Sequence, residues 1–364
     1  MKTYIAKRHV IRYPGNVRGL SLIELMIAIG LGMVVVGALL ALFVNVTRAN
    51  NEMSKMNRQI ENGRFAIQLL QDDLAHAGFW ADFVPPFEDR NVTTPTDAPA
   101  AFPDPCKDPA SWDAVDRNNL IGIPAQSDIG TCGVVTSQLA DTDALVVRHA
   151  ETTTGTACGG EVCFQASQCG PEINDAPPKR YVLGTAGLTL HKMDCVGTGT
   201  PQIMPITAGT TAVTRRYVSN IYYVRDDFTL MRSAFVGDEH LAPQPVIDGI
   251  EALRIEYGID SVGKNGAAVS YTGAVNRGDG IPDDYVNAGD LTCNSAADCD
   301  AANIVAVRIH VLARSTEATP GYTDTKTYVM GGTGDLGPFN DGFKRHVFTT
   351  TVRLVNPSGR RETP

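Results

Sequence analysis

The side chain with the clearest chemical demand in this sequence is Glu24, because it lies near the start of a long apolar run. Residues 25–44, which follow it, are all apolar or glycine. A carboxylate at the centre of a bilayer costs about 2.5–3.5 kcal/mol on insertion scales, so a protein that keeps one there usually has a use for it. We therefore expect Glu24 to have a cationic partner.

The apolar run is long enough to cross a membrane. The 20 residues from Leu25 to Val44 would extend about 30 Å as a helix, which matches a bilayer core. No small-residue cleavage pattern follows the run, so we expect the segment, about residues 22–46, to be retained. The preceding residues carry positive charges and no acid, which predicts a cytoplasmic N-terminus and an exported C-terminal bulk. These charges are on Lys2, Lys7, Arg8, Arg12 and Arg18.

The residues at the head of this span, Gly-Leu-Ser-Leu-Ile-Glu over 19–24, resemble the processing signal of type IV prepilins. The resemblance implies that a prepilin peptidase cuts between Gly19 and Leu20 on the cytoplasmic side. It would remove residues 1–19 as a leader peptide and methylate the new amine of Leu20, which stands where the family usually has phenylalanine. The resemblance also implies that Glu24 pairs with the N-terminal amine of a neighbouring subunit during assembly.

Beyond the apolar run, the sequence predicts that the same helix continues. Apolar or small residues recur at alternating spacings of three and four, which is one stripe along a helix. They are Met53, Met56, Ile60, Gly63, Ile67, Leu70, Leu74 and Ala77. No proline occurs between Pro14 and Pro85, so we predict one helix over residues 20–77 that is ended by Gly78. We expect the stripe to pack against the chain's own head domain. Major pilins usually carry a proline midway along this helix, so its absence suggests a minor subunit.

For the remaining residues, 78–364, we predict a β-rich head that forms either one elaborated domain or two domains. Residues 80–140 are expected to form loops with short elements. Alternating apolar and polar residues predict strands at eight places. They are 144–149, 181–191, 213–224, 230–235, 247–257, 304–313, 326–330 and 344–355. No second long helical pattern occurs, so the expected fold class is α+β, with one long N-terminal helix packed on a mainly antiparallel sheet.

The C-terminal half resembles PilW-type minor pilins. The stretches that carry this resemblance are 250–260, 280–285, 304–314 and 346–356, together with 65–79 on the helix. Residues between about 80 and 215 show no such resemblance. We therefore divide the head into a variable, cysteine-containing region, 78–215, and a PilW-like region, 216–364.

All eight cysteines lie beyond the apolar run, on the expected outer side. They are Cys106, Cys132, Cys158, Cys163, Cys169, Cys195, Cys293 and Cys299. An even number in an exported domain indicates disulfide bonds. We predict one pair, Cys293 with Cys299, and leave the other pairings open. Zinc is the less favoured use, because no Cys-x-x-Cys occurs and His191 near Cys195 has no matching partner motif.

The charge of the chain argues against nucleic acid as a partner. The formal net charge is −9, and removal of the five positive charges of the leader would leave −14. An acidic head repels phosphate backbones. Two arginine pairs, Arg215-Arg216 and Arg360-Arg361, are interpreted as solvated surface.

One loop has residues that could ligate a metal. Asp279, Asp283 and Asp284 resemble the second half of a calcium loop, and Asp260 or Asp290 could add oxygens. The favoured alternative is a turn stabilised by aspartate and glycine. No other cofactor is expected. Enzyme signatures are absent, and scattered histidines such as His76, His149 and His240 are expected on surfaces or in satisfied pockets, so we do not expect an enzyme.

Taken together, the resemblance implies a minor pilin of a type IV pilus. Such a protein would be a single-pass inner-membrane protein with a periplasmic head, and later part of an extracellular pilus. It would prime assembly with other minor pilins and the major pilin, near the tip and beneath an adhesin. The sequence leaves open whether the pilus serves twitching motility, adhesion or DNA uptake. One alternative is a minor pseudopilin of type II secretion. An alternative of another class is a membrane-anchored periplasmic enzyme that keeps its leader.

Overall fold

The computed structural model describes residues 19–155, 158–197, 206–271 and 276–362. The chain divides into two compact units, residues 1–54 and 55–364, and each is described by itself. A single helix, α1 (Leu22–His76), runs through the boundary between them. The long N-terminal helix predicted over 20–77 is therefore confirmed to within two residues at its start and one at its end.

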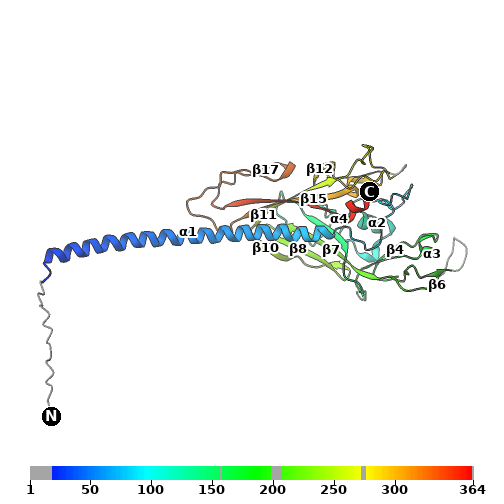
Figure 1. Ribbon diagram of the computed structural model, residues 1–364, viewed down its shortest axis with the longest axis horizontal. Coiled ribbons are helices and arrows are strands. Elements are labelled where there is room, and N and C mark those ends of the chain that lie inside the picture. The colour runs from blue at the N-terminus through cyan, green and yellow to red at the C-terminus, as the bar shows by residue number, and fades with distance from the viewer. Residues whose placement is uncertain (1–18, 156–157, 198–205, 272–275, 363–364) are drawn as a thin grey trace, which may run out of the picture. The chain divides into compact units, whose positions relative to one another are not determined.

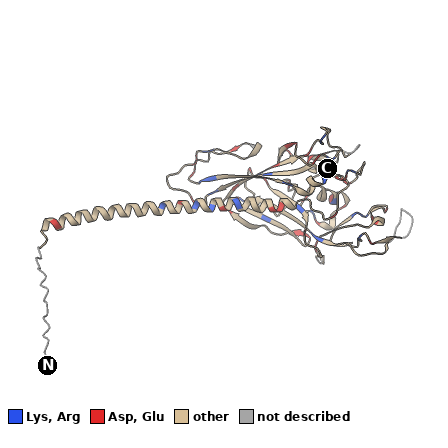
Figure 2. Ribbon diagram, viewed as in Figure 1, with Lys and Arg blue, Asp and Glu red and all other residues tan. Residues whose placement is uncertain are grey.

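The first half of α1 is apolar on all sides. No charged residue lies between Glu24 and Arg48, as the uninterrupted tan ribbon in Figure 2 shows. The apolar side chains in this part of the helix are exposed. Among the described residues, α1 is the one helix long and apolar enough to cross a membrane. This agrees with the predicted span.

The second unit contains two main antiparallel sheets. The larger sheet has eight strands, with β7 at its centre. They are β1 (Ala125–Gln126), β2 (Leu145–Ala150), β3 (Cys163–Ala166), β4 (Tyr181–Gly184), β7 (Thr214–Val224), β8 (Thr229–Val236), β9 (Glu239–His240) and β10 (Gln244–Asp248). The smaller sheet has the order β12 (Asp284–Asn287), β11 (Ile250–Ile259), β15 (Ile304–Arg314) and β18 (Arg345–Arg353).

Short elements complete the head. Three two-stranded ribbons pair β5 (Val196–Gly197) with β6 (Ile206–Ala208), β13 (Cys293–Ser295) with β14 (Asp298–Cys299), and β16 (Tyr328–Val329) with β17 (Asp335–Leu336). The short helices are α2 (Ala114–Gly122), α3 (Gly170–Ile173) and α4 (Val355–Arg361), with 3-10 turns at Pro109–Ser111, Asp300–Asn303 and Gly331–Thr333. One long helix on antiparallel strands is the predicted α+β class, which is confirmed.

The C-terminal half of α1 runs between the strands of the two sheets, as Figure 1 shows. Ala66, Leu70 and Leu74 are fully buried and lie in one apolar cluster with residues of both sheets. Gly63 allows the closest approach, because a Cβ there would lie 2.1 Å from the ring of Phe348 on β18.

The predicted stripe is buried only in part. Met53 and Met56 are exposed, so this part of the prediction is wrong. Burial begins at Gln59, whose side-chain amide donates to the Ala313 carbonyl oxygen at 2.7 Å. The spacing of apolar residues identified the correct face of the helix, but not the point where the head begins to cover it.

A polar anchor fixes the last turns of α1 to the larger sheet. The Asp73 carboxylate lies 3.2 Å from His149 Nε2, and it accepts from Asn220 Nδ2 at 2.9 Å and from the Tyr222 hydroxyl at 3.0 Å. The helix then ends at Gly78, which has φ +70° and donates its N–H to the Arg148 carbonyl oxygen at 2.9 Å. This confirms the predicted stop at Gly78.

Several predicted strands differ from the observed ones. The strand expected over 247–257 is two strands, because the chain turns at Gly249 with φ +77° and passes from the larger sheet to the smaller one. A Cβ at Gly249 would lie 2.9 Å from the Arg314 carbonyl oxygen, so alternation alone could not reveal the break. The segment 344–355 is a strand only to Arg353 and then forms α4.

Two more predicted strands are shorter than expected. The segment 181–191 is a strand only to Gly184, and the segment 326–330 only over Tyr328–Val329. The predicted regional boundary at 215/216 falls inside β7, which pairs with β2 and β3 from the first region and with β8 from the second. The two regions therefore share one sheet, within one compact unit.

Candidate functional site

The start of α1 carries a reciprocal cap that sequence reasoning missed. The Ser21 backbone N–H donates to Glu24 Oε2 at 2.9 Å, and the Glu24 N–H donates to Ser21 Oγ at 3.2 Å. Ser-x-x-Glu before an apolar run is the sequence signature of this capping box, so the signal was present. Glu24 thus helps to begin the helix, while no bond to its other carboxylate oxygen occurs within the described residues.

The bond between Gly19 and Leu20 lies just outside the helix. Both residues are exposed and precede the first helical residue, Leu22, and nothing lies within 4 Å of a Cβ placed on Gly19. The bond is therefore accessible and lies outside regular secondary structure. The rest of the leader, residues 1–18, lies outside the described residues.

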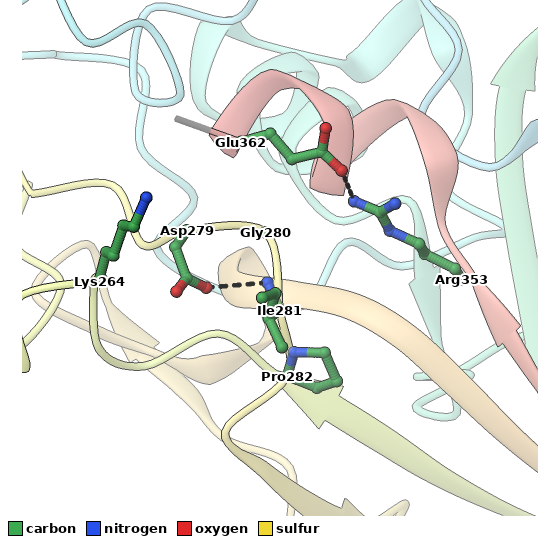
Figure 3. Close-up of a pocket in the computed structure, with 7 residues that line it drawn as sticks. All are labelled: Lys264, Asp279, Gly280, Ile281, Pro282, Arg353 and Glu362. Atoms are coloured by element: carbon green, nitrogen blue, oxygen red, sulfur yellow. Dashed lines mark hydrogen bonds and ion pairs between the residues drawn. The ribbon is translucent and has the colours of Figure 1, made fainter. Parts of the chain in front are cut away.

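The predicted metal loop lies beside a cavity of about 590 Å³. Figure 3 shows its lining: Asp279, Gly280, Ile281 and Pro282 face Lys264 on one side and the Arg353–Glu362 ion pair on the other. Charges of both signs line this cavity, and they include two cationic side chains.

The carboxylates of this loop act as acceptors for backbone N–H groups. Asp279 Oδ1 accepts from Ile281, Asp284 Oδ1 from its neighbour Tyr285, and Asp283 Oδ2 from Val262 at 2.9 Å. This is the geometry of the favoured alternative, a turn held by aspartate and glycine. Among the described residues, no group of three His, Cys, Asp or Glu side chains could hold a metal ion.

Asp260 lies under the same loop and is buried. It accepts from the backbone N–H groups of Asp279 at 3.2 Å and Gly280 at 2.8 Å, and its carboxylate lies 3.7 Å from Arg361 Nη1. Desolvation raises the pKa of Asp260. A Cβ on Gly278, which has φ +83°, would lie 2.1 Å from an Asp260 oxygen, so this glycine lets the loop close over the carboxylate.

The C-terminal arginines are an anchor, not solvated surface. Arg361 is fully buried and donates to Asn303 Oδ1 at 3.1 Å and to the Tyr271 hydroxyl at 3.2 Å. Arg360 is ion-paired with Glu88 and donates to the Gly78 carbonyl oxygen at 3.1 Å. The interpretation of this pair as solvated is therefore wrong, because α4 folds back onto the head, which the sequence pattern did not show.

All eight cysteines are paired in disulfides. The bonds join Cys293 to Cys299, Cys106 to Cys132, Cys158 to Cys163, and Cys169 to Cys195. The predicted pair is confirmed, and Cys293 and Cys299 face each other across β13 and β14. Three of the four bonds tie down the variable region, where long loops dominate.

The histidines considered for chemistry have structural partners or lie at the surface. His240 lies between the hydroxyls of Ser219 and Ser233, at 3.2 and 3.3 Å, and burial lowers its pKa to about 4. His149 is held by Asp73, and His76 is exposed at the end of α1. No arrangement of nucleophile, base and acid in a cavity emerges from these residues.

Comparison with known proteins gives a family match within the head. Residues 221–356 match the family model PilW, described as type IV pilus-assembly protein W. Four of the five stretches that carried the PilW resemblance lie in this range, so the resemblance is confirmed there. No curated protein matches the chain.

One solved structure among those similar to the chain is a type IV-like pilin from Thermus thermophilus. The match has 14% sequence identity and a TM-score of 0.24, and it covers 61% of this chain and 80% of that one.

Proposed function

We propose that this protein is a minor pilin of a type IV pilus and that it acts in priming pilus assembly. The observation that carries the proposal is the family match over residues 221–356, on a head that packs against one end of an apolar N-terminal helix. The helix supports membrane anchoring, and the head supplies a disulfide-bonded outer domain.

The proposed mechanism begins with processing. A prepilin peptidase cuts the exposed bond between Gly19 and Leu20 and methylates the amine of Leu20. The Ser21–Glu24 cap occupies only one carboxylate oxygen, so the other can pair with the N-terminal amine of a neighbouring subunit. That pair would offset the cost of a carboxylate in the membrane and set the axial register of the helices.

The head then acts as a structural part, and we propose no reaction for it. Its size suits a terminal position with other minor pilins and the major pilin, beneath a tip adhesin. Calcium binding at Asp279, Asp283 and Asp284 stays a prediction. Calorimetric titration of the purified chain with calcium tests it, and the absence of heat and of a stability change would remove it.

A gene deletion tests the proposed function. We expect a strain lacking this chain to lose most surface pili, as counted by electron microscopy, and to regain them on complementation. Labelling of the chain in sheared pili should mark filament ends. Even labelling along the shafts would contradict the tip position. Normal piliation with a secretion defect would favour the pseudopilin alternative.

A further inference from the structure

A cavity of about 350 Å³ lies in the variable region, outside the residues that match the PilW family model. Three parts of the chain line it: the loop that precedes α2, the helix α2 itself, and the start of β4. Cavities that bind small molecules usually measure about 300–1,000 Å³ and carry a few convergent polar groups. This cavity is at the small end of that range, and its charged lining residues are Asp97, Arg117 and Arg180.

Asp97 is the lining residue whose bonding the fold leaves most incomplete. Its Oδ1 atom is buried and has no hydrogen-bond partner in the described part of the chain. Burial raises the pKa of Asp97 to about 6, although the charge of Arg180 acts in the opposite direction. A buried polar group without a partner lowers stability, and a carboxylate with a raised pKa in a cavity is a common mark of a functional site. We therefore expect a ligand to donate a hydrogen bond to this carboxylate.

Two guanidinium groups line the same cavity and have donors to spare. Arg117 donates from Nε to the Leu183 carbonyl oxygen at 3.0 Å, which leaves both of its terminal nitrogens free among the described residues. The side chain of Arg180 forms no hydrogen bond or ion pair with any described residue, and it acts on Asp97 through its charge alone. Guanidinium groups bind carboxylates and phosphates by paired N–H donors. The cavity thus has the donors for an anion.

The polar groups are held in place by the fold. The Ala100 N–H donates to Asn119 Oδ1 at 3.0 Å, which fixes the loop of Asp97 to α2. The Tyr181 hydroxyl donates to Asn118 Oδ1 at 2.8 Å, which fixes the start of β4 to the same helix. A site that is already ordered loses little conformational freedom when a ligand binds. The lining is therefore preorganised.

The balance of charge and hydrogen bonding selects the class of ligand. Two arginines against one aspartate give the lining a net charge of +1, which one carboxylate neutralises. A phosphate monoester, at about −1.5 to −2, exceeds that charge. An ammonium group would add a positive charge to a lining that is already positive, so a hydroxyl group is the better donor to Asp97. Apolar ring surface from Pro86, Pro178 and Tyr181 suits the C–H face of a sugar ring.

We propose that this cavity binds a uronic acid unit of an acidic sugar, with its carboxylate on Arg117 and Arg180 and a hydroxyl group donating to Asp97. No covalent bond forms or breaks, so the site serves recognition. The proposal is independent of the assembly function proposed above, because every lining residue lies outside the family match.

Binding of small sugars to the full chain in detergent tests the class of ligand. Saturation-transfer NMR would compare glucuronate and galacturonate with three matched probes. Glucose has the ring without the charge, acetate has the carboxylate without hydroxyl groups, and glucose 6-phosphate has a larger charge. We expect at least one uronate to bind at least tenfold more tightly than all three. Absence of uronate binding, or equal or tighter binding of any of the three, would overturn the proposal.

A pair of neighbouring charge substitutions tests the location. Arg180→Gln removes a cation that lines the cavity, whereas Lys179→Gln removes a cation one residue away whose side chain is exposed and lies outside the lining. We expect Arg180→Gln to lower the affinity for the uronate at least tenfold and Lys179→Gln to leave it within twofold of wild type. Equal affinities of the two variants would overturn the site.

Asp97→Ala tests the role of the unpartnered carboxylate. We expect the affinity for the uronate to fall at least tenfold, while that for acetate stays the same or rises, because acetate has no hydroxyl group and a nearby negative charge is gone. Asp97→Ala should unfold at or above the temperature of the wild-type chain, since it removes a buried carboxylate with incomplete bonding. An unchanged preference for the uronate over acetate would overturn the assigned role.

Discussion

Replacing Gly63 with alanine tests how α1 packs on the smaller sheet. At a solvent-exposed helix position, a glycine-to-alanine substitution stabilises the folded protein by about 0.5–1 kcal/mol, because alanine loses less backbone entropy on folding. At Gly63 the new Cβ would lie 2.1 Å from Phe348 Cε2 and 2.4 Å from Cδ2. Either the ring or the helix must move, and such overpacking costs about 1–3 kcal/mol. We expect a net loss of about 1–2 kcal/mol.

Urea unfolding of the full chain in detergent, followed by the fluorescence of buried Trp80 and Trp112, gives the free energies. Gly359→Ala is the matched control, since Gly359 is helical and nothing lies within 4 Å of a Cβ placed there. It should be neutral or stabilising. In a Phe348→Ala background, Gly63→Ala should become stabilising, a coupling of about 1–3 kcal/mol. If Gly63→Ala changes the free energy of unfolding equally in the wild-type and Phe348→Ala backgrounds, the close packing of Gly63 against Phe348 is refuted.

Three further changes test the electrostatics of the head by unfolding. Arg345→Met leaves buried carboxylates such as Asp324, 2.9 Å from the guanidinium, without their cation and should cost about 3–5 kcal/mol. Loss of a partly exposed arginine such as Arg225 should cost under about 1 kcal/mol. Burial raises the pKa of Asp97 from 3.8 to about 6, so its stabilising contribution is lost as pH rises through 6. Asp97→Asn should add up to about 3 kcal/mol at pH 8 and nothing below pH 3.8; a constant difference across this range would contradict it. Burial lowers the pKa of His240 from 6.5 to about 4, so stability is lost as pH falls through this window, and His240→Gln should flatten that loss in an acid titration.

The regular helices and strands were largely predictable from the sequence. The apolar residues of α1 recur with the helical period, and Gly78 marks its end, and both signals lie within the segment itself. Alternation located β7, β8, β15 and most of β2 to within a residue or two. It failed at Gly249 because the break between β10 and β11 comes from a positive φ and a close backbone approach, not from a change in polarity.

The contacts that join distant parts of the chain were not predictable. The burial of Arg361 depends on Asn303 and Tyr271, which are far away in sequence. The extent of burial along α1 depends on where the head happens to begin, which the exposed Met56 illustrates. The Ser21–Glu24 cap is a different case, because it is local and its sequence signature was present but unused.

The mass of the mature N-terminal peptide tests the central claim most directly. The chain would be isolated from its membrane, digested, and its first peptide identified by mass spectrometry. The proposed function predicts a peptide that begins at Leu20, with one methyl group on its amine. A mature chain that begins at Met1 and keeps residues 1–19 would contradict it.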